Sequence, residues 1–116
     1  MALTIYHNPR CSKSRQTLAL IKDAGIEPEI VLYLEQALTE HDLETLLQKL
    51  GFESAKQLMR RGEAAYKEMG LKNVTDEKTL TQAMLTEPKL IERPIVTKGN
   101  RAILGRPPEN VLQLLG

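Results

Sequence analysis

Residues 3–15 of the chain read LTIYHNPRCSKSR, and this stretch decides the fold. It opens with the β-favouring run Leu3–Tyr6, which stops where Pro9 biases the preceding residue away from helical geometry. A helical pattern starts at Ser12, and Gly25 falls where a left-handed C-terminal cap is expected. Cys11 is therefore predicted to lie at the junction between a strand and a helix.

The segments that follow predict a second strand and then a series of helices. Residues 28–33 are rich in β-favouring side chains, so the first third of the chain should form a βαβ unit with parallel strands. Thr39 and Asp42 have the spacing of a capping box ahead of a leucine-striped helix. Shorter helices are expected after Ser54 and over residues 76–86.

The last part of the chain predicts a hairpin and a final helix. Residues 95–97 and 102–104 are β-favouring runs on either side of a Lys98-Gly99-Asn100 turn. Pro107-Pro108 suits the first turn of a helix. The apolar residues expected on the inner side of that helix are Val111, Leu112 and Leu115.

This order of elements, β-α-β, a helical insertion and then β-β-α, resembles the thioredoxin-like fold. We expect an α/β fold in which a small mixed four-stranded sheet is flanked by helices, in a single domain over residues 1–116. Pro94 stands just before the third expected strand, where that fold carries a cis-proline beside the active thiol.

The composition excludes several classes of function. With 16 basic and 15 acidic residues, the net charge of +1 gives no overall field that would attract nucleic acid or an anionic membrane. The sequence shows no signal-peptide pattern and no apolar run long enough for a membrane span, so we expect a cytoplasmic protein. One cysteine cannot form an internal disulfide, so thiol chemistry here needs a second thiol from outside.

The residues around Cys11 favour a reactive thiol. Free backbone N–H groups and the helix dipole bind anions at a helix start and stabilise a thiolate. A lone cysteine is often a buried small hydrophobe, but a position among Arg10, Lys13 and Arg15 argues against that role. We expect these three cations to be solvated and to contribute a positive electrostatic field around Cys11. Ser14 replaces the second thiol of a CxxC motif, so the loop can attack but cannot resolve its own adduct.

Other candidate residues carry a weaker signal. His7 could orient or help to ionise Cys11, or it could be an ordinary turn residue. Arg93 and Arg106 each precede a proline beside a strand end and could reach a shared pocket, although exposed arginines are more often solvated. Arg60, next to a second arginine, would ordinarily be a solvated helix end.

The whole pattern resembles the glutaredoxin-coupled arsenate reductases, or ArsC family. The opening motif of that family is matched by Ile5–Pro9, Cys11 and Ser14-Arg15. Further segments follow in the family's order: Leu32–Leu34, Leu58–Arg60, Arg93–Val96 and Arg106-Pro107.

The resemblance implies an oxidoreductase, an arsenate reductase that uses glutathione and glutaredoxin. Cys11 would be the nucleophile and His7 its helper, while Arg60, Arg93 and Arg106 would surround the oxyanion as a triad. Guanidinium groups suit arsenate because they supply rigid donor forks and stay protonated near neutral pH. Arsenate would condense with Cys11, glutathione would add to the arsenic, and glutaredoxin would supply the second thiol equivalent. No metal or nucleotide cofactor is implied, and we expect a monomer.

Two other functions stay open. A related family of thioredoxin-like regulators binds RNA polymerase, usually through a CxxC motif, and Ser14 together with the arginine triad favours an enzyme instead. A monothiol glutaredoxin-like deglutathionylase would act without arsenate. Ser12-Lys13 stands where well-studied members of the family carry Gly-Thr, which leaves another oxyanion or a glutathione-linked species open as the substrate.

Overall fold

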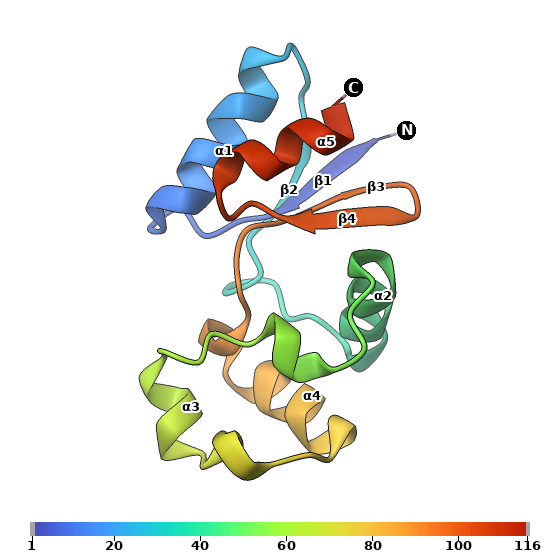
Figure 1. Ribbon diagram of the computed structural model, residues 1–116. Coiled ribbons are helices and arrows are strands. Elements are labelled where there is room, and N and C mark those ends of the chain that lie inside the picture. The colour runs from blue at the N-terminus through green and yellow to red at the C-terminus, as the bar shows by residue number, and fades with distance from the viewer. Residues whose placement is uncertain (1, 116) are drawn as a thin grey trace. The chain divides into compact units, whose positions relative to one another are not determined.

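The computed structural model describes residues 2–115, which form two compact units (Figure 1). One unit combines the chain up to Gln36 with the chain from Arg93 onward, and the other is Ala37–Glu92. The expectation of a single domain over residues 1–116 stays a prediction.

The first unit is built on a four-stranded sheet with the strand order β2-β1-β3-β4. Its strands are β1 (Leu3–Tyr6), β2 (Glu29–Val31), β3 (Ile95–Lys98) and β4 (Arg101–Leu104). β1 pairs in parallel with β2 and antiparallel with β3, and β3 pairs antiparallel with β4. The predicted mixed sheet is confirmed. β2 is shorter than the expected 28–33 because its pairing with β1 covers only Glu29–Val31.

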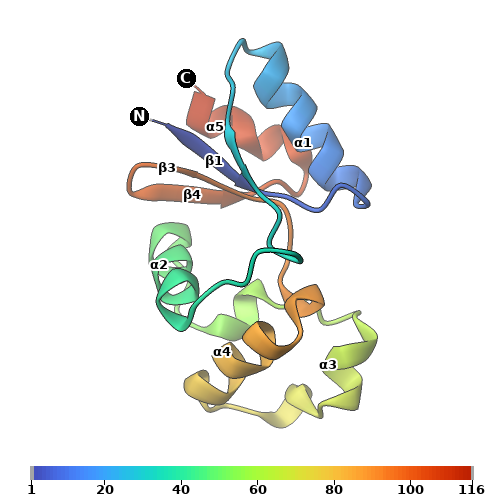
Figure 2. The same ribbon diagram turned by 180° about the vertical axis from the view of Figure 1, so that it is seen from behind.

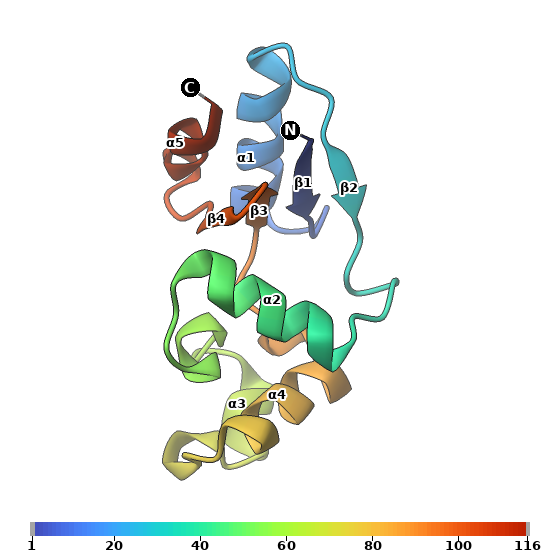
Figure 3. The same cartoon turned by 90° about the vertical axis from the view of Figure 1, so that its right-hand side faces the viewer.

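Two helices lie side by side over one face of this sheet, α1 (Ser12–Asp23) and α5 (Leu112–Leu115) (Figures 1 and 3). Figure 2 shows β1, β2 and α1 of the same unit from behind. A buried cluster joins the sheet to the helices and consists of Leu3, Ile5, Ile21, Val96, Val111 and Leu114. As predicted, α1 is followed by Gly25 in the left-handed region, with φ of 79°. The βαβ unit thus delivers residues 7–11 to the edge where β1 ends and α1 begins.

The last helix differs from the prediction in its inner face. A 3₁₀ turn over Pro108–Val111 precedes α5. A 3₁₀ turn has about 3.0 residues and an α-helical turn about 3.6, so the apolar face shifts along the sequence. Val111 is buried as expected, and Leu114 is buried beside it. The inward placement of Leu112 was wrong, because its side chain is 52% exposed.

The second unit contains α2 (Glu40–Leu50), α3 (Ala64–Glu68) and α4 (Glu77–Thr86). The capping box of α2 is confirmed: the Asp42 backbone N–H donates to Thr39 Oγ1 at 3.1 Å, and the Thr39 N–H donates to Asp42 Oδ2 at 2.8 Å. The expected short helix after Ser54 is a 3₁₀ turn over Ala55–Leu58. Among residues 2–115, no helix is long and apolar enough to cross a membrane.

Gly105 lies where β4 ends and comes very close to its neighbours in the first unit. A Cβ atom placed on it would lie 2.7 Å from Pro94 Cγ and would also collide with the Thr17 side chain. The Gly105 N–H donates to the Pro94 carbonyl oxygen at 2.9 Å, and the Arg93-Pro94 peptide is cis. Only glycine fits this close approach, which sets the position of the residue that follows, Arg106.

We expect Gly105→Ala to lower the free energy of unfolding by about 1–3 kcal/mol, because the added methyl group forces Thr17 or Pro94 to move. Urea unfolding followed by circular dichroism measures this change. Gly62→Ala is the matched control, since a Cβ there would meet nothing within 4 Å. Equal unfolding midpoints for the two variants would contradict the close-packing argument.

Candidate active site

Cys11 lies at the predicted junction, immediately before the first residue of α1. Its backbone is extended, with φ of −94° and ψ of 123°, and its N–H donates to the Asn8 carbonyl oxygen at 3.0 Å. The Arg15 N–H donates to the Cys11 carbonyl oxygen at 3.0 Å, which begins the helical hydrogen-bond series. The thiol is free and partly buried. The strand and the helix therefore hold a free, partly buried thiol at a helix start.

Two of the predicted arginines meet this sulfur within the first unit. Arg106 Nη2 donates to Cys11 Sγ at 3.5 Å, and the Arg93 side chain also hydrogen-bonds the sulfur. Arg106 Nε donates to the Arg93 carbonyl oxygen at 2.7 Å, which holds the guanidinium in place. The proline after each arginine follows a cis peptide bond. The hairpin and the chain on either side of it thus bring positive charge to the helix start.

The surroundings of Cys11 shift the pKa of its thiol in both directions, and the contacts that stabilise the thiolate have the larger effect. Burial raises the pKa of the Cys11 thiol, because burial penalises the thiolate. The Ser14 N–H, the Arg93 side chain, the Lys13 N–H and the charge of Arg106 all lower it. The net result is a pKa below the ordinary cysteine value, so the thiolate is populated at lower pH than in an unperturbed cysteine.

His7 is buried at the end of β1, and its Nδ1 lies 2.6 Å from Ser14 Oγ. Burial lowers the pKa of His7, and the positive charges of Arg15 and Lys22 lower it further. The imidazole is therefore neutral near pH 7, where an unperturbed histidine is already mostly neutral. His7 does not supply a positive charge to Cys11, and its helper role stays a prediction.

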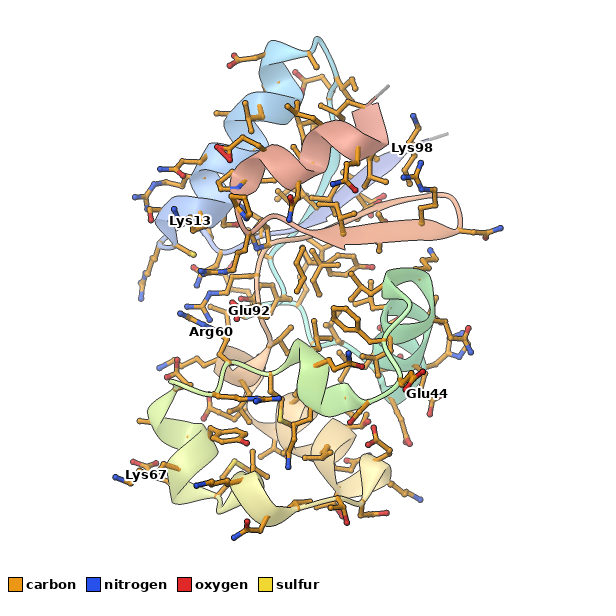
Figure 4. The ribbon with its side chains drawn as sticks, in the orientation of Figure 1. Lys13, Glu44, Arg60, Lys67, Glu92 and Lys98 are labelled. Atoms are coloured by element: carbon orange, nitrogen blue, oxygen red, sulfur yellow. The ribbon has the colours of Figure 1, made fainter. Side chains whose placement is uncertain are left out.

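The cations of the loop and of the first helical turn are exposed, as expected for side chains that act on Cys11 only through their electrostatic field. Arg10 and Lys13 are exposed, and Figure 4 shows Lys13 on the first turn of α1. Arg15 Nη1 donates to the Pro9 carbonyl oxygen at 2.9 Å in an exposed contact. That bond ties the first turn of the helix back to the loop.

Arg60, the third predicted arginine, belongs to the second unit. Its Nε lies 3.4 Å from Glu92 Oε1, and Figure 4 shows the two side chains next to each other. Two backbone bonds set up this pair: the Arg60 N–H donates to the Leu90 carbonyl oxygen, and the Glu92 N–H donates to the Leu58 carbonyl oxygen, each at 2.7 Å. The structure thus gives Arg60 an acidic neighbour, and its part in an oxyanion site stays a prediction.

Sequence reasoning missed three contacts made by or near the predicted site residues. Ser14 was noted only as a missing thiol, whereas its buried hydroxyl binds both His7 and the Asn8 N–H. The pairing of Glu92 with Arg60 was not predicted, because no local pattern brings these two residues together. The Asn8 side chain accepts from the Arg10 N–H at 3.0 Å, an Asx-turn that the Asn-Pro sequence could have suggested.

A pocket of about 280 Å³ adjoins the loop before Cys11. Its lining residues are His7, Asn8, Pro9, Arg10, Leu32, Leu34 and Glu35. Within residues 2–115, no three His, Cys, Asp or Glu side chains are grouped closely enough to hold a metal ion. The Cys11 thiol, with its lowered pKa and two guanidinium groups beside it, is suited to act as a nucleophile.

We expect the rate of Cys11 alkylation by iodoacetamide to rise with pH around a midpoint below about 8.5. Arg106→Ala should raise that midpoint because it removes a donor and a charge from the sulfur. Arg101→Ala, a change at an exposed residue of β4, should leave the midpoint where it is. A midpoint at or above 8.5 in the unaltered protein would show that burial outweighs the stabilising contacts.

Comparison with known proteins places this arrangement in a family. Residues 6–114 match the model of the ArsC family. The chain is 54% identical over 113 residues to the uncharacterized protein YfgD of Escherichia coli K12, covering 97% of this chain and 95% of that protein. It is 45% identical over 116 residues to an arsenate reductase of Haemophilus influenzae, covering 99% and 100% of the two chains. A solved structure described as an arsenate reductase from Vibrio cholerae has a TM-score of 0.94 at 46% identity and covers 97% of each chain. These matches confirm the resemblance and the thioredoxin-like fold, and the chain belongs to the ArsC family.

Proposed function

We propose that this protein reduces arsenate, with Cys11 as the nucleophile and with glutathione and glutaredoxin as the outside thiols. One observation carries the proposal: the Cys11 sulfur lies at a helix start and accepts hydrogen bonds from the Arg93 and Arg106 side chains. The relatives from Haemophilus influenzae and Vibrio cholerae that are named arsenate reductases support the choice of oxyanion.

The geometry suits attack on an oxyanion for an electrostatic reason. A thiolate and an anionic substrate repel each other, and guanidinium forks next to the sulfur offset that repulsion. Arg106 is held by its Nε bond to Arg93, which leaves its Nη2 directed at the sulfur. Arg60 completes the proposed triad as a third guanidinium. Preorganised donors of this kind stabilise the negative charge that accumulates as a bond to sulfur forms.

The proposed reaction balances only with two outside thiols. The Cys11 sulfur forms a bond to arsenic, and an oxygen of arsenate leaves as water. The glutathione thiol then forms a second arsenic–sulfur bond and displaces another water. Attack by the glutaredoxin thiol on the glutathione sulfur makes a disulfide and leaves two electrons on arsenic, which is reduced from As(V) to As(III). Water releases arsenite and restores the Cys11 thiol. Ser14 in place of a second cysteine is why the disulfide forms outside the chain.

The need for reduced outside thiols extends the proposal to location and assembly. Glutathione and glutaredoxin act in reducing compartments, so we propose that the protein works in the cytoplasm. We also propose a monomeric enzyme, because a single chain already brings the nucleophile and two guanidiniums together.

The direct test is a coupled assay with arsenate, glutathione, glutaredoxin, glutathione reductase and NADPH. We expect arsenate-dependent NADPH consumption, and we expect Cys11→Ser to abolish it because no other cysteine can replace the nucleophile. Phosphate in place of arsenate is the control for a general anion effect. Full activity of Cys11→Ser would eliminate the mechanism. Consumption of NADPH with a glutathionylated peptide and without arsenate would favour a deglutathionylase instead.

Arg93→Lys and Arg106→Lys separate the fork geometry from the charge. Each keeps a cation but loses bidentate donation, so we expect the KM for arsenate to rise roughly tenfold or more while the protein stays folded. Arg101→Lys, at an exposed position of the hairpin, is the matched control. Unchanged kinetics in both variants would remove these arginines from the oxyanion site.

Arg60→Lys should raise the KM for arsenate in the same way, because it removes a guanidinium fork from the proposed triad. Arg61→Lys is a control from the next position, and its side chain is exposed. Steady-state kinetics at several arsenate concentrations compares them. Equal KM values for the two variants would reduce the triad to a pair.

A further inference from the structure

Ser14 connects the two ends of the reactive loop. Its side chain is completely buried, and its Oγ accepts a hydrogen bond from the Asn8 N–H at 3.1 Å and lies 2.6 Å from His7 Nδ1. Its own backbone N–H is one of the groups that hold the Cys11 sulfur. The same residue thus touches the sulfur through its backbone and the imidazole through its hydroxyl.

The proton of the Ser14 hydroxyl determines the form of the imidazole. A hydroxyl has one proton to donate, and a backbone N–H can only donate, so the bond from Asn8 uses a lone pair of Oγ. Among the described residues, His7 Nδ1 is the one remaining partner for that proton, and complete burial denies Oγ access to water. The Ser14 hydroxyl therefore donates to Nδ1, which must be unprotonated, and the ring proton of His7 is on Nε2.

We propose that Ser14 is a positioning residue that fixes His7 as the Nε2–H tautomer, so that His7 serves the site as a hydrogen-bond donor and not as a base. His7 lines a pocket of about 280 Å³ next to the loop and a second pocket of about 360 Å³ beside α1. Neither lining includes Cys11, and an N–H donor in these pockets is suited to an anionic ligand. The identity of that anion rests on the proposed function, whereas the tautomer does not.

The surroundings of His7 agree with this assignment. The nearby charges of Arg15 and Lys22, together with burial, lower the pKa of the imidazole. Protonating Nδ1 would also leave the Ser14 proton without an acceptor among the described residues. A neutral ring with an occupied Nδ1 has only its Nε2–H to offer.

The tautomer can be read from the ¹⁵N chemical shifts of the two ring nitrogens in histidine-labelled protein. The chain has two histidines, and His41→Gln assigns the spectrum. At pH 7 we expect His7 to show a pyridine-type Nδ1 and a pyrrole-type Nε2. In Ser14→Ala we expect this pattern to be replaced by a mixture of tautomers or by the Nδ1–H form. A proton on Nδ1 in the unaltered protein at pH 7 would overturn the proposal.

Kinetics tests whether the tautomer matters for the reaction. Ser14→Ala should lower kcat/KM for arsenate roughly tenfold, the usual scale for losing one hydrogen bond to a charged group. Ser12→Ala, at an exposed serine of the same helical turn, should leave kcat/KM unchanged. An unaltered kcat/KM in Ser14→Ala would overturn the positioning role. If the unaltered protein does not turn over arsenate, the proposed function fails, and the spectrum still decides the tautomer.

A second pair of variants keeps the test decisive if Ser14→Ala does not fold. The side-chain amide of His7→Gln can place a donor where Nε2–H lies, whereas that of His7→Asn reaches only the position of Nδ1. We expect His7→Gln to keep more activity than His7→Asn. The opposite order would show that the contact with Ser14, and not the Nε2 donor, is what the reaction uses.

Discussion

The structure depends on one balance of electrostatic forces, that between the desolvation of a sulfur anion and the groups that compensate it. Burial alone would keep Cys11 protonated. Two backbone N–H groups of the first helical turn and two guanidiniums reverse that effect. These groups come from two segments that are distant in the sequence, since the N–H groups belong to α1 and the arginines flank the hairpin β3–β4. The sheet joins these two segments, because β1, which leads into α1, pairs with β3 of the hairpin.

The rest of the first unit follows from that requirement. β1 must end where α1 begins, because only the first turn of a helix leaves N–H groups free to face an anion. Arg106 must lie close to the Cys11 sulfur. The glycine before it has no side chain that would keep the end of β4 away from Pro94 and Thr17. The core cluster of aliphatic side chains fixes these pieces but takes no part in the chemistry. Core packing thus fixes the positions of these segments, and the polar groups around Cys11 stabilise its thiolate.

Local signals in the sequence predicted most of the elements, and contacts between distant residues were harder to predict. Thr39 with Asp42 and the glycine after α1 act within a few residues, so their caps could be predicted. The inward placement of Leu112 failed because the change from a 3₁₀ turn to an α-helix leaves no mark in the apolar spacing. In the site, the prolines and the family resemblance pointed to Arg93 and Arg106. The bonds of Ser14 to His7 and of Glu92 to Arg60 depend on side-chain placement, which no spacing rule provides.

The ion pair of Arg60 with Glu92 has a consequence for the choice of anion. If Arg60 joins the oxyanion site as proposed, the incoming anion and the Glu92 carboxylate share one guanidinium. A monovalent ion such as chloride gains little beside that carboxylate, because it carries no more charge and lacks the pair of oxygens that a bidentate guanidinium contact needs. A tetrahedral dianion brings two oxygens and a greater charge. In the proposed triad, Glu92 therefore disfavours weakly bound anions more than strongly bound ones.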